Sequence, residues 1–264
     1  MRGEGRRRLG GGAGWAAVVA GLAVIPISAL VLWAGTAAGH PAPQVSLGPS
    51  TPSDLAFGRT VYEERCATCH GPGAGGTVQG PPIVGLGPAA YDFMMSTGRM
   101  PLDQPGAQAK RRRPVLSPAE IRAVIDFLTS LGPPGTPIPR VDVAAGNLSE
   151  GEQLYQANCA PCHSTSGNGG AVGQLVAPTV HQATTTQVAE AVRIGPGTMP
   201  RFGEASLDQS QLNSLVRYVV YLRNPIDRGG SGLDHVGPLI EGFVGLGIGL
   251  GLIVVITRYI GTRT

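Results

Sequence analysis

The chain has 264 residues, of which 41 are glycine, 23 are proline and only 14% are charged. Aromatic residues make up 5%, so side chains alone would form a thin core, and the composition favours a large apolar cofactor. The formal net charge is +3, and its basic runs, at residues 2–8 and 110–113, carry no interleaved aromatic residues. We therefore expect no nucleic-acid partner.

The N-terminal part consists of an arginine-rich end, residues 1–14, and an uncharged apolar run, residues 15–38. This run is long enough to cross about 30 Å of hydrocarbon as a helix. The alternative is a signal peptide cleaved after the small residues 36–38, but the run is longer than a usual signal core. We favour an uncleaved transmembrane helix, followed by a Pro-, Gly- and Ser-rich linker at 39–53.

Two blocks follow, at 54–131 and 148–223, separated by a Pro- and Gly-rich linker at 132–147. The blocks repeat each other. The pattern Gly-x-x-x-Tyr-x-x-x-Cys begins at Gly58 and again at Gly151, and a Met-Pro pair follows in each block. The repeat predicts two similar small domains.

Each block closes with apolar residues at helical spacing, over 116–131 and 207–222. Ser117 and Asp208 are the predicted N-caps, because Glu120 and Gln211 follow three residues later in a capping-box pattern. Strand signals are nearly absent. The predicted fold is all-α, with each block containing a short helix, a cysteine motif, a glycine-rich loop and a terminal helix.

The C-terminal part is predicted as a linker at 224–235, a second transmembrane helix at 236–257 and a tail at 258–264. Glu241 lies near the outer end of the apolar run, where a membrane tolerates charge better than at its centre. A buried glycine-rich helix is the alternative, but the basic tail favours a span. Positive residues outside both spans place both chain ends in the cytoplasm and residues 39–235 outside it.

All four cysteines lie in two Cys-x-x-Cys-His motifs, at 66–70 and 159–163. This motif is the attachment signature of c-type haem. Two thiols at this spacing reach the two vinyl groups of the porphyrin, and the following histidine ligates the iron through Nε2. The sequence predicts two covalent haem c groups, attached and ligated by Cys66, Cys69, His70, Cys159, Cys162 and His163.

Three other interpretations of the cysteine motifs are open. A thioredoxin-like redox pair does not require the histidine and belongs to a βαβ setting, which is not predicted here. A zinc site would need His40, His181 or His235, whose spacing is irregular. A disulfide is the third alternative, since the expected compartment is oxidising.

Met100 and Met199 are the predicted sixth ligands of the two irons, 30 and 36 residues after the motif histidines. Both precede proline, which restricts the methionine backbone to extended conformations. A distal methionine raises the reduction potential relative to bis-histidine ligation. Met94 and Met95 are alternatives, but neither has a counterpart in the second block, so we expect them to pack in the core.

The carbonyls of Pro81 and Pro178 are the predicted acceptors for the Nδ1–H groups of the ligating histidines. Such a bond fixes the tautomer of a metal-bound histidine. The two prolines follow the histidines by 11 and 15 residues.

Each block resembles a class I cytochrome c domain. The resemblance is carried by the glycine and tyrosine of the first helix, the Cys-x-x-Cys-His motif, a Pro-x-aliphatic stretch and the Met-Pro pair. In that family the first helix crosses the last one closely at the glycine. The resemblance implies that the crossing partners on the last helices are Val124, Phe127, Leu215 and Tyr218.

The chain as a whole has an arginine-rich end, a membrane span, two domains and a second span. In this order it resembles the dihaem cytochrome c subunit of the actinobacterial quinol–cytochrome c reductase. The resemblance implies an electron-transfer subunit without substrate chemistry of its own. Cytochrome b and iron–sulfur subunits would oxidise menaquinol in the cell membrane. The iron–sulfur subunit would pass electrons through the two haems to a terminal cytochrome c oxidase.

Two other functions are weighed against this one. The first is an anchored dihaem carrier for another dehydrogenase, such as a quinoprotein. The second is a haem peroxidase with one five-coordinate iron, against which the two Met-Pro pairs argue. The run Lys110–Arg113 either attracts an acidic partner surface or is a solvated insertion.

Overall fold

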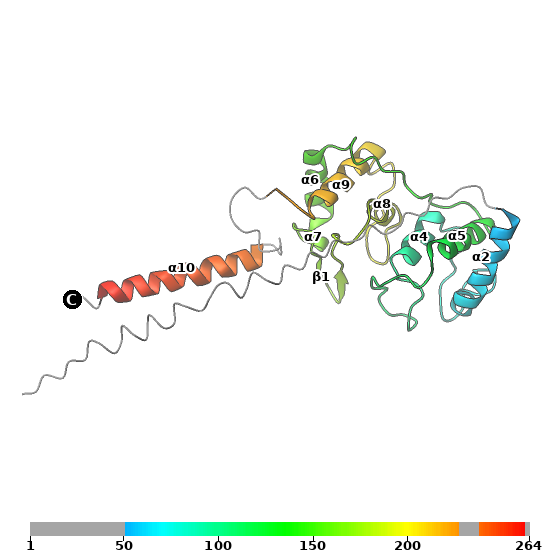
Figure 1. Ribbon diagram of the computed structural model, residues 1–264, viewed down its shortest axis with the longest axis horizontal. Helices are drawn as coiled ribbons and strands as arrows, with labels where there is room; N and C mark the ends of the chain where they lie inside the picture. The colour runs from blue at the N-terminus through cyan, green and yellow to red at the C-terminus, as the bar shows by residue number, and fades with distance from the viewer. Residues whose placement is uncertain (1–50, 227–237, 262–264) are drawn as a thin grey trace, which may run out of the picture. The chain divides into compact units, whose positions relative to one another are not determined.

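The computed structural model describes residues 51–226 and 238–261 (Figure 1). The predicted N-terminal end, the span at 15–38, and His40 and His235 lie outside the described residues. The described part is mostly helical, as the sequence predicts.

The first block contains the helices α2 (Pro52–Arg65), α3 (Ala67–His70), α4 (Pro88–Ser96) and α5 (Pro118–Ser130). Ser117 caps α5 as predicted, since its hydroxyl accepts a hydrogen bond from the N–H of Glu120 and the Glu120 carboxylate accepts one from the N–H of Ser117. Pro118, at the first position of α5, also stabilises the start of the helix, because its fixed φ suits the first helical turn. Helix α5 packs along α2 and α4.

The second block repeats this arrangement with α6 (Leu148–Asn158), α7 (Ala160–His163), α8 (Thr185–Ile194) and α9 (Gln209–Tyr221). Asp208 caps α9 as predicted, with the N–H of Gln211 donating to its carboxylate at 2.9 Å. Helix α6 packs along α9, just as α2 packs along α5.

The first and last helices of each block cross closely at a glycine. A methyl group at Gly58 would lie 2.5 Å from the carbonyl carbon of Ala123, and one at Gly151 would lie 2.6 Å from that of Ser214. The Tyr62 and Phe127 rings pack 5.5 Å apart beside the first crossing, and the Tyr155 ring packs 5.4 Å from that of Tyr218 beside the second. The predicted partners Phe127 and Tyr218 therefore lie at the crossings.

The expectation that strands would be absent is wrong for the second block. A two-stranded antiparallel hairpin, β1 (Gly170–Val172) and β2 (Leu175–Ala177), follows the second cysteine motif. Gly173 has a φ of +60°, which the tight turn between the strands requires. The strands have only three residues each, too few to show a recognisable alternation in the sequence.

The blocks contact each other through α4 and α8, which hold equivalent places in the two repeats. The C-terminal part of the chain forms one long helix, α10 (Pro238–Gly261). Residues 241–261 are long and apolar enough to cross a membrane, with a mean hydropathy of 2.0. The helix continues to Gly261, beyond the predicted end of the span at residue 257.

Candidate haem-binding sites

The two cysteine motifs have the same backbone conformation. Helix α2 ends where Cys66 begins a tight turn, and the N–H of His70 donates to the carbonyl of Cys66 at 3.0 Å. In the second block the N–H of His163 donates to the carbonyl of Cys159 at 2.8 Å. Each motif therefore forms a single helical turn, α3 or α7, directly after the first helix of its domain.

The imidazole rings of both motif histidines are oriented by proline carbonyls. Nδ1 of His70 lies 2.8 Å from the carbonyl oxygen of Pro81, and Nδ1 of His163 lies 2.8 Å from that of Pro178. Within the described residues, neither Nε2 atom takes part in a hydrogen bond. Since Nδ1 donates to a carbonyl, the Nε2 lone pair of each ring is left for a metal.

Glycines bring the proline loops close to the motifs. A side chain at Gly80 would lie 2.8 Å from the carbonyl oxygen of Cys69, and one at Gly169 would lie 2.8 Å from the carbonyl carbon of Pro178. Gly169 also has a φ of +86°, a conformation that favours glycine. The hairpin between His163 and Pro178 accounts for the longer spacing in the second block without moving the carbonyl away.

The tyrosines of the repeat, Tyr62 and Tyr155, support the motifs through their hydroxyl groups, a role that the sequence alone does not assign to them. The hydroxyl of Tyr62 donates to the carbonyl of Gly71 at 2.7 Å, and that of Tyr155 donates to the carbonyl of Ser164 at 2.9 Å. Each bond holds the residue that follows a motif histidine. Burial raises the pKa of Tyr62 to about 12, so its hydroxyl stays a donor at neutral pH. Their equal spacing in the repeat is the signal that could have revealed this role.

All four motif cysteines are half-buried, and their thiols are free. Burial, with a smaller effect of the neighbouring cysteine, raises the pKa of Cys66 and of Cys159 to about 11. None of the four forms a disulfide. Across the described residues, no group of three His, Cys, Asp or Glu side chains could hold a metal ion, so the zinc interpretation gains no support.

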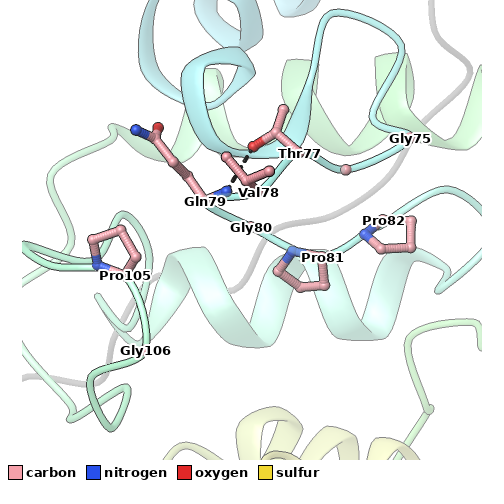
Figure 2. Close-up of a pocket in the computed structure, with 10 residues that line it drawn as sticks. Gly75, Thr77, Val78, Gln79, Gly80, Pro81, Pro82, Pro105 and Gly106 are labelled. Carbon is pink, nitrogen blue, oxygen red and sulfur yellow. Dashed lines mark hydrogen bonds between the residues drawn. The ribbon is translucent and has the colours of Figure 1, made fainter.

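The two predicted methionine ligands are half-buried, and Met199 packs against the core of the second block. Met95, weighed as an alternative to Met100, is buried in the core of the first block instead. An open cavity of about 540 Å³ lies between residues 75–82, which follow His70, and residues 105–106, which follow Met100 (Figure 2). The loops after the two predicted ligands of the first haem thus face one space.

The remaining predicted features have structural roles. His181 lies with Nε2 2.7 Å from the carbonyl oxygen of Ser166, within the loop of the second block. In the run Lys110–Arg113, Arg111 donates to the side chain of Gln187 in the other block at 3.0 Å, and Arg112 pairs with Asp103. Half of the run is therefore occupied by contacts within the chain.

Known proteins with similar sequences give the context of these sites. A family model described as "Cytochrome C oxidase, cbb3-type, subunit III" matches twice, at residues 53–128 and 146–219. The cytochrome bc1 complex cytochrome c subunit of Mycobacterium bovis is 32% identical, and the alignment covers 98% of this chain and 92% of that protein. The chain belongs to this family of subunits. The member from Corynebacterium diphtheriae is 28% identical over 78% of this chain and 80% of that protein.

A more distant similarity is found with cbb3-type oxidases. The CcoP subunit of Rhodobacter capsulatus is 26% identical over 61% of this chain and 60% of that protein. The Mycobacterium bovis bc1 subunit matches nearly the full length, whereas the CcoP alignment covers less than two thirds. The comparison confirms the whole-chain resemblance that the sequence indicated.

Proposed function

We propose that this chain is the dihaem electron carrier of a respiratory cytochrome bc1 complex that oxidises menaquinol. The observation that carries the proposal is the repeated site. Each of two cytochrome c domains presents two free thiols and a histidine whose Nδ1 is bonded to a proline carbonyl. Membership of the bc1 subunit family supports the assignment to this complex.

The residues present fit a covalently bound haem in each domain. The thiols of Cys66 and Cys69, and of Cys159 and Cys162, would add across the two vinyl groups of each haem, the S–H hydrogen passing to the vinyl carbon, and form thioethers. Each histidine would ligate iron through its unused Nε2. Each haem, when bound, would supply an iron that accepts and releases one electron.

Met100 and Met199 would occupy the sixth positions. Thioether ligation favours the reduced iron and raises the potential, which suits a carrier that receives electrons from an iron–sulfur protein. With both axial positions filled, neither iron would bind a small substrate. The role of this chain is therefore to hold and orient the two electron-carrying groups.

The partners follow from the family. Cytochrome b and the iron–sulfur subunit would deliver electrons to one haem, and the other would pass them to a terminal cytochrome c oxidase. Helix α10 would anchor the subunit in the cell membrane, together with the predicted N-terminal span, with the haem domains on the extracytoplasmic side.

The proposal is tested by purification in a mild detergent and a haem stain of every band. The chain should copurify with a cytochrome b and an iron–sulfur subunit and should carry two covalent haems. The double variant Cys66→Ala, Cys69→Ala should keep one covalent haem, and two remaining haems would contradict the attachment sites. Copurification with a quinoprotein dehydrogenase alone would overturn the assignment to a bc1 complex.

Carbon monoxide distinguishes a carrier from a haem peroxidase. If methionine occupies the sixth position of both irons, the reduced protein should bind carbon monoxide slowly and incompletely. Prompt binding at either haem would show an open position and would support the peroxidase alternative.

A further inference from the structure

The junction between the two haem domains contains a polar network centred on Gln187 of α8. The side-chain amide of Gln187 donates to the hydroxyl of Ser96 at 3.1 Å, and its oxygen accepts from Arg111 at 3.0 Å. The same oxygen accepts from the N–H of Thr184 and completes the N-terminal cap of α8. Partners from the first domain therefore fix the start of a helix in the second.

Two carboxyl groups are buried at the same junction. Asp92 of α4 is 5% exposed and Glu190 of α8 is fully buried, and their carboxyl groups lie within hydrogen-bonding reach of each other. Among the described residues, Oδ1 of Asp92 and both carboxyl oxygens of Glu190 have no hydrogen-bond donor. Two buried carboxyl groups are therefore neighbours at the junction, and no other described residue donates a hydrogen bond to these three oxygens.

The basic side chains nearby in the sequence donate no hydrogen bond to these oxygens, although Nη1 of Arg99 and Nη2 of Arg193 are also buried without an acceptor among the described residues. Arg99 lies over the ring of Phe93, with 4.6 Å from its guanidinium carbon to the ring centre. Arg193 donates to the carbonyls of Phe202 and Leu207. The other charged groups on the helices and loop that pack against α4 and α8 form no bond to these carboxyl oxygens; they are Arg111, Glu120, Arg122, Asp126 and Arg217.

Two neighbouring carboxylates in a buried site cannot both stay ionised, because desolvation and mutual repulsion disfavour the double anion. One proton turns the repulsion into an O–H···O hydrogen bond. Burial raises the pKa of Glu190 to about 11, and the neighbouring Asp92 adds to the rise. Burial raises the pKa of Asp92 as well. Burial therefore favours the neutral form of both carboxyl groups, that of Asp92 and that of Glu190.

We propose that Asp92 and Glu190 form a proton-binding site that holds one proton between the two haem domains and keeps α4 and α8 packed together. The proton satisfies two oxygens at once, one as donor and one as acceptor. When the domains separate, water solvates both carboxyl groups, which then ionise near their ordinary values. Packing of the two haem domains is therefore linked to the uptake of a proton.

The sign of the pH dependence follows from this linkage. The packed form keeps its proton at pH values where the separated form has lost it, so packing is strongest in acid and weakens as pH rises. The pH window of this effect opens at the ordinary carboxyl pKa of 4.5 and extends into the alkaline range, because burial and the neighbouring Asp92 raise the pKa of Glu190. Within it, each pH unit should shift the equilibrium about tenfold towards the separated form for one proton.

Infrared spectroscopy of the full chain in detergent tests the proton directly. At neutral pH the wild type should show the C=O stretch of a protonated carboxylic acid, which shifts in heavy water. Glu190→Gln should lose this band, and Asp92→Asn should lose it or shift it, because the partner of the acid changes. Glu152→Gln, at an exposed position of α6, is the matched control and should leave it intact.

A second measurement tests the linkage. The free energy of unfolding of the wild type, relative to the Asp92→Asn, Glu190→Gln double variant, should fall as pH rises between about pH 6 and 9. The double variant keeps amide hydrogen bonds at the junction but has no proton to lose. A protonated-acid band that is absent at neutral pH, or that survives unchanged in Glu190→Gln, would overturn the proposal. Equal pH dependence of wild type and double variant would also overturn it.

Discussion

The glycines at the helix crossings give a quantitative prediction about the haem domains. Replacing Gly151 with alanine puts a methyl group 2.6 Å from the carbonyl carbon of Ser214 and 2.9 Å from Cβ of Tyr218. Ordinary contacts between carbon atoms are about 3.5–4.0 Å. Helix α6 must therefore retreat from α9 by about 1 Å, and Cys159 at its end moves with it.

The loss in free energy of unfolding caused by Gly151→Ala depends on which atoms the new methyl group meets. Overpacking of a well-packed core costs about 1–3 kcal/mol, and the upper end applies here because a backbone carbonyl cannot rotate away. Alanine regains about 1 kcal/mol, since it is a better helix former than glycine. The expected net loss of about 2 kcal/mol lowers the melting temperature of a domain of this size by about 8–16 °C.

Thermal unfolding followed by circular dichroism measures the loss, and hydrogen exchange locates it. The variant Gly151→Ala should expose amides of α6 and α9, whereas Gly58→Ala should expose those of α2 and α5. Gly73→Ala is the control, because no atom lies within 4 Å of its added methyl group. A Gly151→Ala protein that melts like the wild type would refute the view that the glycine sets the distance between α6 and α9.

Two further predictions concern the distal ligands and the helix caps. Met100→His and Met199→His should each lower the reduction potential of one haem while the haem stays attached, because imidazole replaces a thioether. Potentiometric titration of both variants checks this, and two unchanged potentials would mean that the distal ligands are misassigned. Asp208→Ala removes the acceptor for the N–H of Gln211 and should destabilise the second domain by about 1 kcal/mol in urea unfolding. An unchanged midpoint would show that the cap does not contribute.

Much of the fold could be predicted because its signals are local. The caps at Ser117 and Asp208 depend on side chains three residues apart, and such patterns can be read directly from the chain. The duplication strengthened each signal, since a feature found at the same place in both blocks is rarely accidental. The proline carbonyls beside His70 and His163 were identified in this way.

The hairpin and the domain junction could not be predicted, for different physical reasons. The hairpin strands are only three residues long, and their hydrogen bonds rather than a hydrophobic face define them. The pairing of Asp92 with Glu190 joins residues 98 positions apart in two different domains. In the sequence each is an ordinary carboxyl group on a helix, and only the packing of α4 on α8 brings them together.

The contact between α4 and α8 also has a kinetic consequence. Two separate cytochromes exchange electrons at a rate proportional to their concentrations, and every transfer waits for a collision. In this chain the second domain is covalently tethered to the first, which is equivalent to a partner at millimolar concentration or above even when the two are not packed together. If each domain carries a haem as proposed, exchange between the two haems would be a first-order process that does not change with dilution of the protein.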